Sequence, residues 1–505
     1  MNLTPAIRAF LSFRARTISR FAEQAEVHQS KVLQRLIKSG VNTEWGRLYD
    51  YRGISCYEDF RNRVPISSYD DFKPFVERMR KGAKDILWPG EIKWYARSSG
   101  TTHDKSKYIP VSNQGLQRIH YSGSLDTVAL YLHRRKDSRL LQGKGLILGG
   151  SYQPDSNTNK SKTGDLSAIL IDNMNPIANI IRVPDKETAL LADFEEKRKN
   201  IALQTINSNV TNISGVPSWM MGVLKQVLEI SEKEYISQVW PNLEVFFHGG
   251  VSFAPYQEQY KRVINSNKMH FMETYNASEG FFGIQDNPED SSMLLMVDYD
   301  IFYEFIPLEE LDYPNPKAIS LAEVQLRQTY AMLISTSCGL WRYLIGDTVK
   351  FTCTKPYKFI ITGRTKLFIN AFGEELMIDN AERGMAETCR LTKSNIVDYT
   401  AAPVFMDDNA KCRHQWLIEF DTPPESLEQF SSILDKTLQQ LNSDYEAKRF
   451  KNITLQPLDI IVARKDLFKD WLKNKGKLGG QHKVPRLNNS RELIDELIKL
   501  NYQEP

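Results

Sequence analysis

Apolar and polar positions follow a helix-type period at the start of the chain. Residues 1–26 alternate short apolar groups with arginines, which is typical of an amphipathic helix. In residues 64–79, VPISSYDDFKPFVERM, serines stand just before an apolar-periodic segment, as they do at many helix starts. We therefore expect a helical lead-in over residues 1–87.

The pattern changes near residue 92, where short β-branched or aromatic runs begin to alternate with helical windows such as residues 217–230. This alternation predicts an α/β body around a buried sheet. Strand-type runs occupy residues 145–150, 166–171, 243–250, 268–275, 304–308, 330–339, 348–353 and 358–364.

Beyond residue 377 the pattern becomes helix, strand, helix and strand, over residues 380–390, 414–421, 427–442 and 453–462. A segment of roughly 140 residues is a normal size for one domain. We therefore expect an α/β protein with a large N-terminal domain over residues 1–362 and a smaller α+β domain over residues 363–505.

Composition narrows the classes of function. Hydrophobic residues make up 41% of the 505 residues and charged ones 25%, an ordinary globular balance. The formal net charge is only +3, with acidic and basic residues mixed, which argues against a nucleic-acid partner. The chain holds no run of roughly twenty apolar residues, so we expect no membrane partner and a cytoplasmic protein. The five cysteines are widely spaced, which favours reduced thiols over a zinc site.

Residues 96–112, ARSSGTTHDKSKYIPVS, combine hydroxyls, backbone N–H groups and one glycine after a strand-type run. A phosphate removed from water needs several such donors, so the segment suits the β- and γ-phosphates of a nucleotide, although a plain surface loop has the same composition. It lacks the GxxxxGK[ST] spacing of a P-loop NTPase. The candidate phosphate ligands are Ser98, Ser99, Gly100, Thr101 and Thr102, with Lys105 and Lys107 as nearby cations.

Two further segments follow apolar strands. HGGVSFAPY (248–256) places Gly250 where a flat ring fits against bare backbone, or where the chain simply turns. In ETYNASEGFFG (273–283) we expect Tyr275, Ser278 and Glu279 on one short loop, with the tyrosine stacking on a purine and the carboxylate binding magnesium. The alternative for this second segment is a charged surface loop.

A third segment, GLWRYLIGDTVKF (339–351), is expected to end an apolar strand at Gly346 and Asp347. An aspartate at that place can accept hydrogen bonds from both ribose hydroxyls, as acidic residues do in other nucleotide sites. The simpler interpretation is an aspartate in a turn.

Taken together, these segments resemble the acyl-adenylate-forming superfamily, and more particularly the auxin-responsive Gretchen Hagen 3 family of acyl acid amido synthetases. SSGTTHDKSKYIP, ETYNASEGFFG and GLWRYLIGDTVKF match its three nucleotide motifs in order and approximate spacing. The resemblance continues through IITGRTKLFINAFGEELM, NSDYEAKR and GKLGGQHKVPRL, and so covers essentially the whole chain. His103 and Asp104 in the phosphate loop depart from the plant pattern, so we expect a microbial member with substrates other than plant hormones.

The resemblance implies a two-step ligation that uses ATP and Mg²⁺. A carboxylic acid first attacks the α-phosphate of ATP, giving an acyl-adenylate and pyrophosphate. An amine, usually that of an amino acid, then takes the acyl group and releases AMP. The implied architecture is an adenylation domain with mixed β-sheets flanked by helices, and a mobile C-terminal lid domain with a hinge near residues 363–366.

The resemblance also implies residue roles. Arg364 matches a hinge-proximal catalytic arginine, whose positive charge stabilises the phosphorus centre under attack, and Lys366 matches a residue that contacts phosphate or ribose. Either also fits a solvated hinge charge. Lys483 in HKVPR matches the mobile catalytic lysine, with Lys475 and Lys477 as close competitors. The remaining nucleotide-binding assignments are Ser98, Ser99, Gly100, Thr101, Thr102 and Lys107 for phosphates, Gly250, Tyr275, Asn276, Ala277 and Ser278 for the adenine side, Glu279 for the metal and Asp347 for ribose.

The acyl pocket is less defined. Val216, Trp219 and Met220 stand at helical spacing and, with Phe253, are the candidate pocket walls. The same stripe fits an ordinary helix core, and it identifies neither the acid nor the amine. Two other functions stay open: an acyl-CoA synthetase-like enzyme that passes the acyl group to coenzyme A, and a non-catalytic nucleotide-binding protein.

Overall fold

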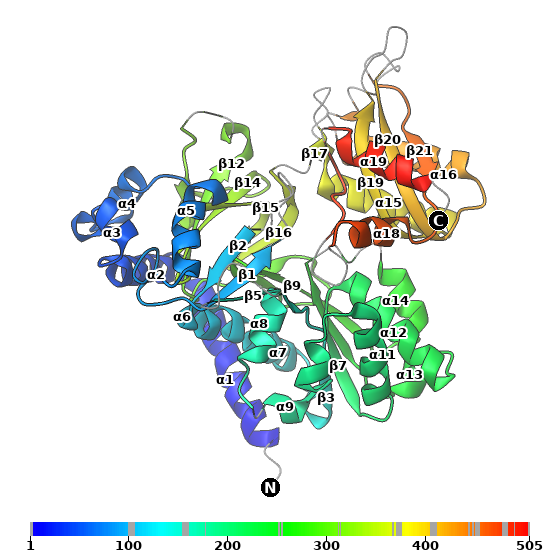
Figure 1. Cartoon of the computed structure of the whole chain (residues 1–505), viewed down its shortest axis with the longest axis horizontal. Coiled ribbons are helices and arrows are strands. Elements are labelled where there is room, and N and C mark those ends of the chain that lie inside the picture. The colour runs from blue at the N-terminus through cyan, green and yellow to red at the C-terminus, as the bar shows by residue number, and fades with distance from the viewer. Residues whose placement is uncertain are drawn as a thin grey trace. The chain divides into compact units, whose positions relative to one another are not determined.

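A computed structural model gives the structure of the chain (Figure 1). The chain forms two compact units: unit 1 is Met1–Val251, Arg262–Ile345 and Val349–Ile360, and unit 2 is Ser252–Lys261, Gly346–Thr348 and Ile361–Pro505. Residues described by the structure are 4–98, 107–153, 161–176, 178–250, 253, 256–311, 313, 315–365, 368–369, 376–404, 412–442, 445–446, 449, 455–476, 483–488 and 490–502.

A 12-stranded sheet forms the centre of unit 1. One half, from β9 to β6, pairs in parallel, and the other half is antiparallel. Parallel strands are covered on both faces, which explains why their sequences read as continuous apolar runs. The strand order is β13 (Ile319–Ser320), β12 (Ile301–Pro307), β14 (Thr329–Thr336), β15 (Tyr343–Thr354), β16 (Tyr357–Arg364), β11 (Met293–Leu295), β10 (Gly280–Gln285), β9 (His270–Ala277), β8 (Val245–Gly249), β7 (Val210–Gly215), β3 (Lys144–Ile147) and β6 (Arg182–Val183).

Helices cover both faces of the parallel half (Figure 1). On one face Tyr131 of α7 (Ser122–Arg134) packs edge-on against Phe247, with ring centroids 5.7 Å apart. On the other face a Cβ at Gly215 would lie 3.5 Å from Cε of Met220 in α12 (Pro217–Ser231). The other helices after β2 in unit 1 are α6 (Asn113–Gly115), α8 (Leu166–Asp172), α9 (Ala178–Ile181), α10 (Lys186–Ala189), α11 (Phe194–Thr205) and α13 (Ile236–Val239).

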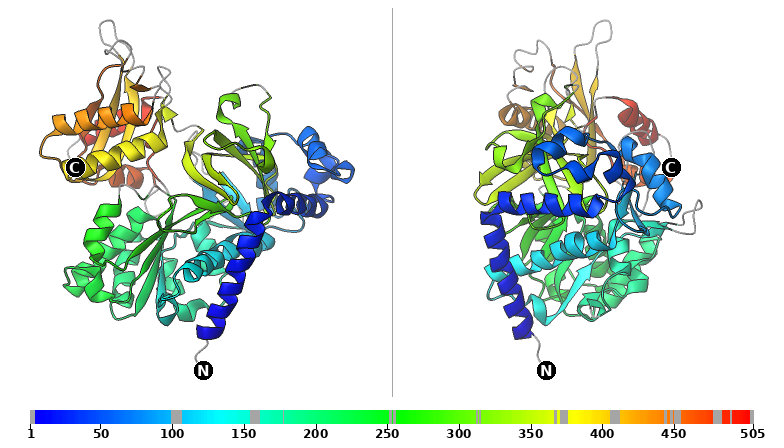
Figure 2. Two further views of the ribbon diagram at one scale, coloured as in Figure 1. Left: turned by 180° about the vertical axis from the view of Figure 1, so that it is seen from behind. Right: turned by 90° about the vertical axis from the view of Figure 1, so that its left-hand side faces the viewer.

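The expected helical lead-in is confirmed. Ser68 caps α5 in a capping box, in which its backbone N–H donates to the Asp71 carboxylate at 2.7 Å. α1 packs along α7 on the outer face of unit 1 (Figure 2). The lead-in helices are α1 (Thr4–Glu23), α2 (Ala25–Gly40), α3 (Glu44–Leu48), α4 (Tyr57–Arg63) and α5 (Tyr69–Arg80).

A second sheet in unit 1 has four strands in the order β2 (Lys107–Val111), β1 (Trp94–Ser98), β5 (Lys162–Gly164) and β4 (Tyr152–Gln153). The strand expected over residues 166–171 is wrong: this segment forms α8, which begins after Asp165. A short apolar run fits a buried helix as well as a buried strand, and here the helix covers β1.

Unit 2 is an α+β structure with two small sheets. β17 (Phe368–Ile369) pairs with β18 (Leu376–Met377), and β19 (Asn395–Val404), β20 (Arg413–Thr422) and β21 (Asp459–Val462) form the other sheet. Trp416 stacks on Tyr399 in the core, with centroids 5.4 Å apart. Its helices are α15 (Ile378–Thr392), α16 (Leu427–Leu441), α18 (Leu467–Asn474) and α19 (Glu492–Asn501), and α14 (Gln257–Ile264) has most of its residues there.

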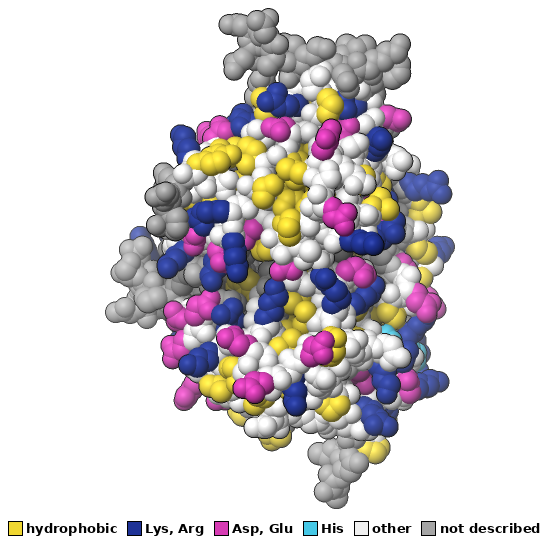
Figure 3. All heavy atoms as spheres, turned by 90° about the vertical axis from the view of Figure 1, so that its right-hand side faces the viewer, with side chains coloured by type: hydrophobic (Ala, Val, Ile, Leu, Met, Phe, Trp, Pro, Cys, Tyr) yellow, Lys and Arg dark blue, Asp and Glu magenta, His cyan; other side chains and the backbone are white. Residues whose placement is uncertain are grey.

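The large α/β domain and the smaller α+β domain expected from the sequence are thereby confirmed. The boundary at residue 362 and the hinge at residues 363–366 stay predictions. Among the described helices, none is both long and apolar enough to cross a membrane. On the face drawn in Figure 3, lysines and arginines are interspersed with aspartates and glutamates.

Candidate functional site

The carboxyl ends of β7, β8 and β9 meet at one edge of the large sheet, named here the β7–β9 edge. The strands are parallel, with Gly215 opposite His248 and Gly249 opposite Thr274. Ligands of parallel α/β sheets bind at such edges. α12 begins at Pro217 directly after β7, so the first N–H groups of a helix are also placed there.

Two predicted site residues form the tight turn of the β9–β10 hairpin. Ser278 and Glu279 follow Ala277, which pairs with Gly280. The single short loop expected for Tyr275, Ser278 and Glu279 is wrong, because β9 continues through Tyr275 to Ala277. Ser278 is 7% exposed and Glu279 6%, although turns usually present polar side chains to solvent. This burial supports keeping Glu279 as a candidate ligand-binding residue.

Tyr275 lies in β9 and is nearly buried. Its ring packs edge-on against Phe282, with centroids 4.8 Å apart, and a second aromatic contact joins it to Phe359 at 6.1 Å. The predicted stacking of Tyr275 on a purine stays a prediction. Gly250 follows β8 with a φ of 82°, a backbone conformation that favours glycine.

His120 lies against the same hairpin. Its imidazole Nδ1 is 3.4 Å from Oδ1 of Asn276, and the side chain is fully buried. Burial lowers the pKa of His120 to about 4, so the ring is neutral at physiological pH. The residue belongs to a π-helical turn, Leu116–Tyr121, and such turns are frequent at functional sites. A single histidine in an apolar helix gives no signal of its own, so sequence reasoning does not find it.

β1 and β2 lie on either side of the predicted phosphate loop. Ser98 pairs with Lys107 in this antiparallel ladder. The Lys107 ammonium lies 5.9 Å from the ring centroid of Tyr69, the first residue of α5. The lead-in therefore helps to hold this cation at the base of the loop. Outside the described residues lie Ser99, Gly100, Thr101, Thr102 and Lys105, whose roles stay predictions.

A buried lysine anchors the loop after β3, the strand next to β7. The Lys197 ammonium donates to the carbonyls of Gly149 at 3.1 Å and Gly150 at 2.9 Å. Burial lowers the pKa of Lys197 to about 8. A Cβ at Gly150 would lie 1.9 Å from the Asp165 carboxylate, so only glycine fits there. The anchored loop adds a rigid neighbour to the β7–β9 edge.

Asp347 belongs to unit 2 and is 8% exposed. The strand end expected at this residue is wrong, because β15 runs on to Thr354. Gly346 has a φ of 89°, and its carbonyl accepts the backbone N–H of Thr365 at 2.8 Å. Asp347 is thus joined, within unit 2, to the predicted hinge. The side chain of Arg364 and the whole of Lys366 lie outside the described residues.

In the Lys–x–Pro–Arg segment of unit 2, Arg486 is buried and fixed by ion pairs, whereas Lys483 is exposed. The Arg486 guanidinium is buried and pairs with Glu382 and with Asp398, the latter at 3.3 Å. Its carbonyl accepts the backbone N–H of Ala401 at 2.8 Å. Lys483 is exposed, three residues before Arg486.

The competing lysines differ from Lys483. The Lys475 ammonium pairs with Glu496 at 3.0 Å and lies 5.9 Å from the ring of Trp471, as surface lysines often do. Lys477 lies outside the described residues. The assignment of Lys483 as the catalytic lysine stays a prediction.

The candidate acyl-pocket residues fall in both units. Val216 and Trp219 are half-buried at the start of α12, and Met220 is fully buried against β7. Phe253 belongs to unit 2, where its ring lies 5.3 Å from that of Tyr260. Met220 therefore has the packing of a core residue, and the acyl-pocket role of all four stays a prediction.

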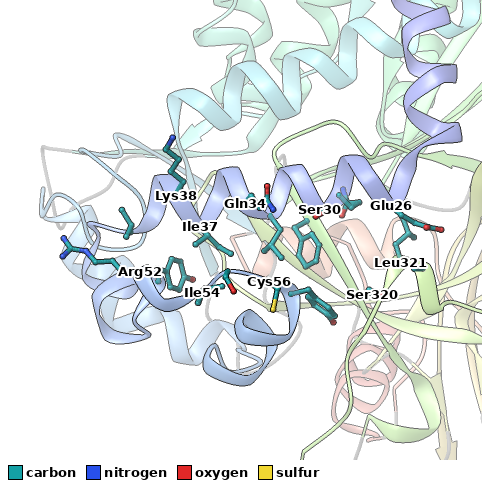
Figure 4. Close-up of a pocket in the computed structure, with 18 residues that line it drawn as sticks. Glu26, Ser30, Gln34, Ile37, Lys38, Arg52, Ile54, Cys56, Ser320 and Leu321 are labelled. Carbon is teal, nitrogen blue, oxygen red and sulfur yellow. The ribbon is translucent and has the colours of Figure 1, made fainter.

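A cavity of about 490 Å³ lies elsewhere in unit 1, along α2 (Figure 4). Its lining includes Leu33, Ile37 and Phe302, with Cys56 at its side. None of the predicted site residues line this cavity. The apolar side chains that do line it, such as Leu33, Ile37 and Phe302, are buried. The cavity is therefore separate from the candidate site.

Models of the GH3 family match most of the chain. The N-terminal domain model covers residues 14–269, the central domain model residues 294–364 and the C-terminal domain model residues 379–492. A similar curated protein is the indole-3-acetic acid-amido synthetase GH3.3 of Arabidopsis thaliana. It is 22% identical over 97% of this chain and 94% of that protein.

Two solved structures share the fold. The GH3.15 acyl acid amido synthetase superposes with a TM-score of 0.79 at 16% identity, covering 98% of this chain and 97% of its own. A 2-hydroxyisobutyryl-CoA ligase, in the postadenylation state with 2-HIB-AMP, gives 0.60 at 13% identity, over 94% and 92% of the two chains. Because the family models span so much of the sequence, the chain belongs to the GH3 family.

Proposed function

We propose that this chain is an ATP-dependent acyl acid amido synthetase. It activates a carboxylic acid as the acyl-adenylate, with release of pyrophosphate, and then joins the acyl group to an amine, usually that of an amino acid, with release of AMP. The observation that carries the proposal is the buried Ser278–Glu279 turn at the β7–β9 edge of a GH3-family chain.

Glu279 is the residue proposed to hold Mg²⁺. Mg²⁺ prefers oxygen ligands and usually takes one or two protein carboxylates, with substrate phosphates and water completing its shell. Within the described part of the chain no three metal-ligating side chains gather, so the ion would share the phosphates of ATP. The bound ion supplies positive charge to the phosphates.

Charge is the main obstacle to the first step, because a carboxylate must approach the anionic α-phosphate. Two unit charges about 4 Å apart repel by about 4 kcal/mol at an effective dielectric constant near 20. Lys107, the N-terminus of α12 and Lys483 are the groups we assign to offset this repulsion. Asp347 is assigned to the ribose hydroxyls.

The proposal is tested by a screen of carboxylic acids against the twenty amino acids, with pyrophosphate release as the signal and mass spectrometry of the products. The expected result is acid-dependent pyrophosphate release together with an amide product and AMP. Release of pyrophosphate with a thioester product, formed only when coenzyme A is present, would assign the chain to acyl-CoA synthesis. ATP binding without pyrophosphate release for any acid would support a non-catalytic nucleotide-binding protein.

A Glu279→Gln variant, assayed at several magnesium concentrations, tests the metal role. We expect a higher magnesium requirement and a slower first step, with the same fold by circular dichroism. An unchanged magnesium dependence would remove Glu279 from the metal site.

A further inference from the structure

Glu273 occupies a distinct position at the β7–β9 edge. It precedes Tyr275 by two residues in β9, so both side chains project from the same face of the sheet. Its register partner on β8 is His248, and its backbone N–H donates to the side chain of Gln285 at 2.8 Å. Glu273 therefore lies two residue pairs further into the sheet than Gly250 and Tyr275, which are predicted to bind the base.

The Glu273 carboxyl is partly buried, and among the described residues no hydrogen bond or ion pair reaches it. Burial raises the pKa of Glu273 to about 7, and no charged group in the described part of the chain adds to this shift. The groups beside it are neutral. Burial lowers the pKa of His248 on β8 to about 3, and Gln285 on β10 is an amide whose Nε2 donates to the carbonyl of Asp290 at 2.9 Å.

A protonated carboxyl offers one O–H donor and one carbonyl acceptor, the same pair as a glutamine amide. Asparagine and glutamine use that pair to bind the N6–H and N7 edge of adenine with two hydrogen bonds. A 6-oxo base such as hypoxanthine presents two acceptors at the same edge, so one of the two bonds is lost. A desolvated glutamic acid whose carboxyl has no partner among the described residues thus matches adenine in chemistry.

We propose that Glu273, in its protonated form, reads the amino edge of adenine and selects ATP over nucleotides with 6-oxo bases. The inference rests on the proposed function, because it requires a nucleotide at the β7–β9 edge. It has a pH consequence: the deprotonated carboxylate has no donor, so adenine recognition weakens as the pH rises through 7.

The test is direct binding of Mg·ATP and Mg·ITP to the full-length protein by calorimetry, at pH 6 and pH 8.5. Glu273→Gln keeps a donor and an acceptor at both pH values, and Glu273→Met removes both at similar volume. We expect the wild-type protein at pH 6 to bind ATP about 10-fold or more tightly than ITP. This preference should shrink severalfold at pH 8.5, stay constant in Glu273→Gln, and nearly vanish in Glu273→Met.

Two outcomes would overturn the inference while leaving the proposed function intact. One is ATP binding with the same ATP/ITP ratio in wild type and folded Glu273→Met. The other is an identical pH dependence in wild type and Glu273→Gln, a comparison that decides the matter even if the methionine variant does not fold. If the wild-type protein binds no ATP at either pH, both the inference and the proposed function fail.

Discussion

Arg342 and Glu304 form a buried ion pair in unit 1. The guanidinium Nε lies 2.9 Å from one carboxylate oxygen, and Nη2 lies 2.9 Å from the other. The remaining nitrogen, Nη1, donates to the carbonyls of Arg61 at 2.9 Å and Val64 at 2.7 Å. The arginine of the GLWRYLIGD motif therefore ties the helical lead-in to the large sheet, which is a structural role.

The buried pair of Arg342 and Glu304 leads to a prediction about the free energy of unfolding. Glu304→Gln leaves the Arg342 charge buried without its counter-charge, and such a loss costs about 3–5 kcal/mol. Urea unfolding of unit 1, followed by tryptophan fluorescence, should show a clearly lower midpoint. Glu195→Gln is the matched control, because the Glu195–Arg198 pair is 47% and 28% exposed and is worth about 1 kcal/mol or less. Equal effects of the two substitutions would contradict the structural role.

A pair of glycine substitutions tests the anchored loop after β3. Gly150→Ala places a Cβ 1.9 Å from the Asp165 carboxylate, so we expect a lower melting temperature. Gly222→Ala in α12 meets nothing closer than 3.7 Å, and alanine favours a helix interior by about 0.5–1 kcal/mol over glycine. The two alanine variants should therefore shift the melting temperature in opposite directions. A tolerated Gly150→Ala would mean that the loop is not anchored as described.

The buried, neutral His120 leads to a prediction of how the free energy of unfolding depends on pH. Burial lowers the pKa of His120 to about 4, whereas the unfolded chain keeps a value of about 6.5. Between these values the unfolded chain takes up a proton that the folded chain does not, so the free energy of unfolding falls as the pH falls. The contribution is complete above about pH 6.5 and is lost toward pH 4. Denaturation midpoints measured at pH 7.5, 6 and 5 should decline less in His120→Asn than in wild type, and parallel declines would contradict this role.

Two lysines of unit 2 provide a comparison for catalysis. Lys483→Ala should lower the rate of adenylate formation by about 10²-fold or more, because it removes a positive charge that stabilises the phosphorus centre under attack. Lys475→Ala should change this rate little, because Lys475 is paired with Glu496. The readout is single-turnover pyrophosphate release with a saturating acid. Similar rates in the two variants would remove Lys483 from the mechanism.

Much of the fold was predictable from apolar patterning. Strands were predicted correctly at residues 243–250 and 330–339, because β8 and β14 are buried strands of a large sheet and their sequences are therefore continuously apolar. The run at residues 166–171 was misassigned to a strand because six apolar-rich residues carry too little period to distinguish a strand from a helix. Strand ends were also placed too early at Tyr275 and Asp347, since glycines and polar residues continue within both strands.

The candidate site was only partly predictable. Glu279 and Asp347 stand in motifs whose residue types suggest a nucleotide. His120 and Lys197 stand outside these motifs, and Glu273, although it is the first residue of ETYNASEGFFG, gives no signal of its own. The significance of all three depends on neighbours on other strands and helices. The contact between His120 and Asn276, for example, joins residues that are 156 positions apart.

The central claim is attack of a carboxylate on the α-phosphate of ATP followed by amide formation. It is tested most directly with an acid from the screen whose two carboxylate oxygens are ¹⁸O, incubated with ATP, Mg²⁺ and the amino acid. Attack on the α-phosphate makes one labelled oxygen the bridge of the acyl-adenylate, and cleavage by the amine leaves that oxygen on AMP. The account predicts one ¹⁸O in AMP and one in the amide carbonyl by mass spectrometry. Unlabelled AMP, or ADP with a labelled inorganic phosphate, would contradict it.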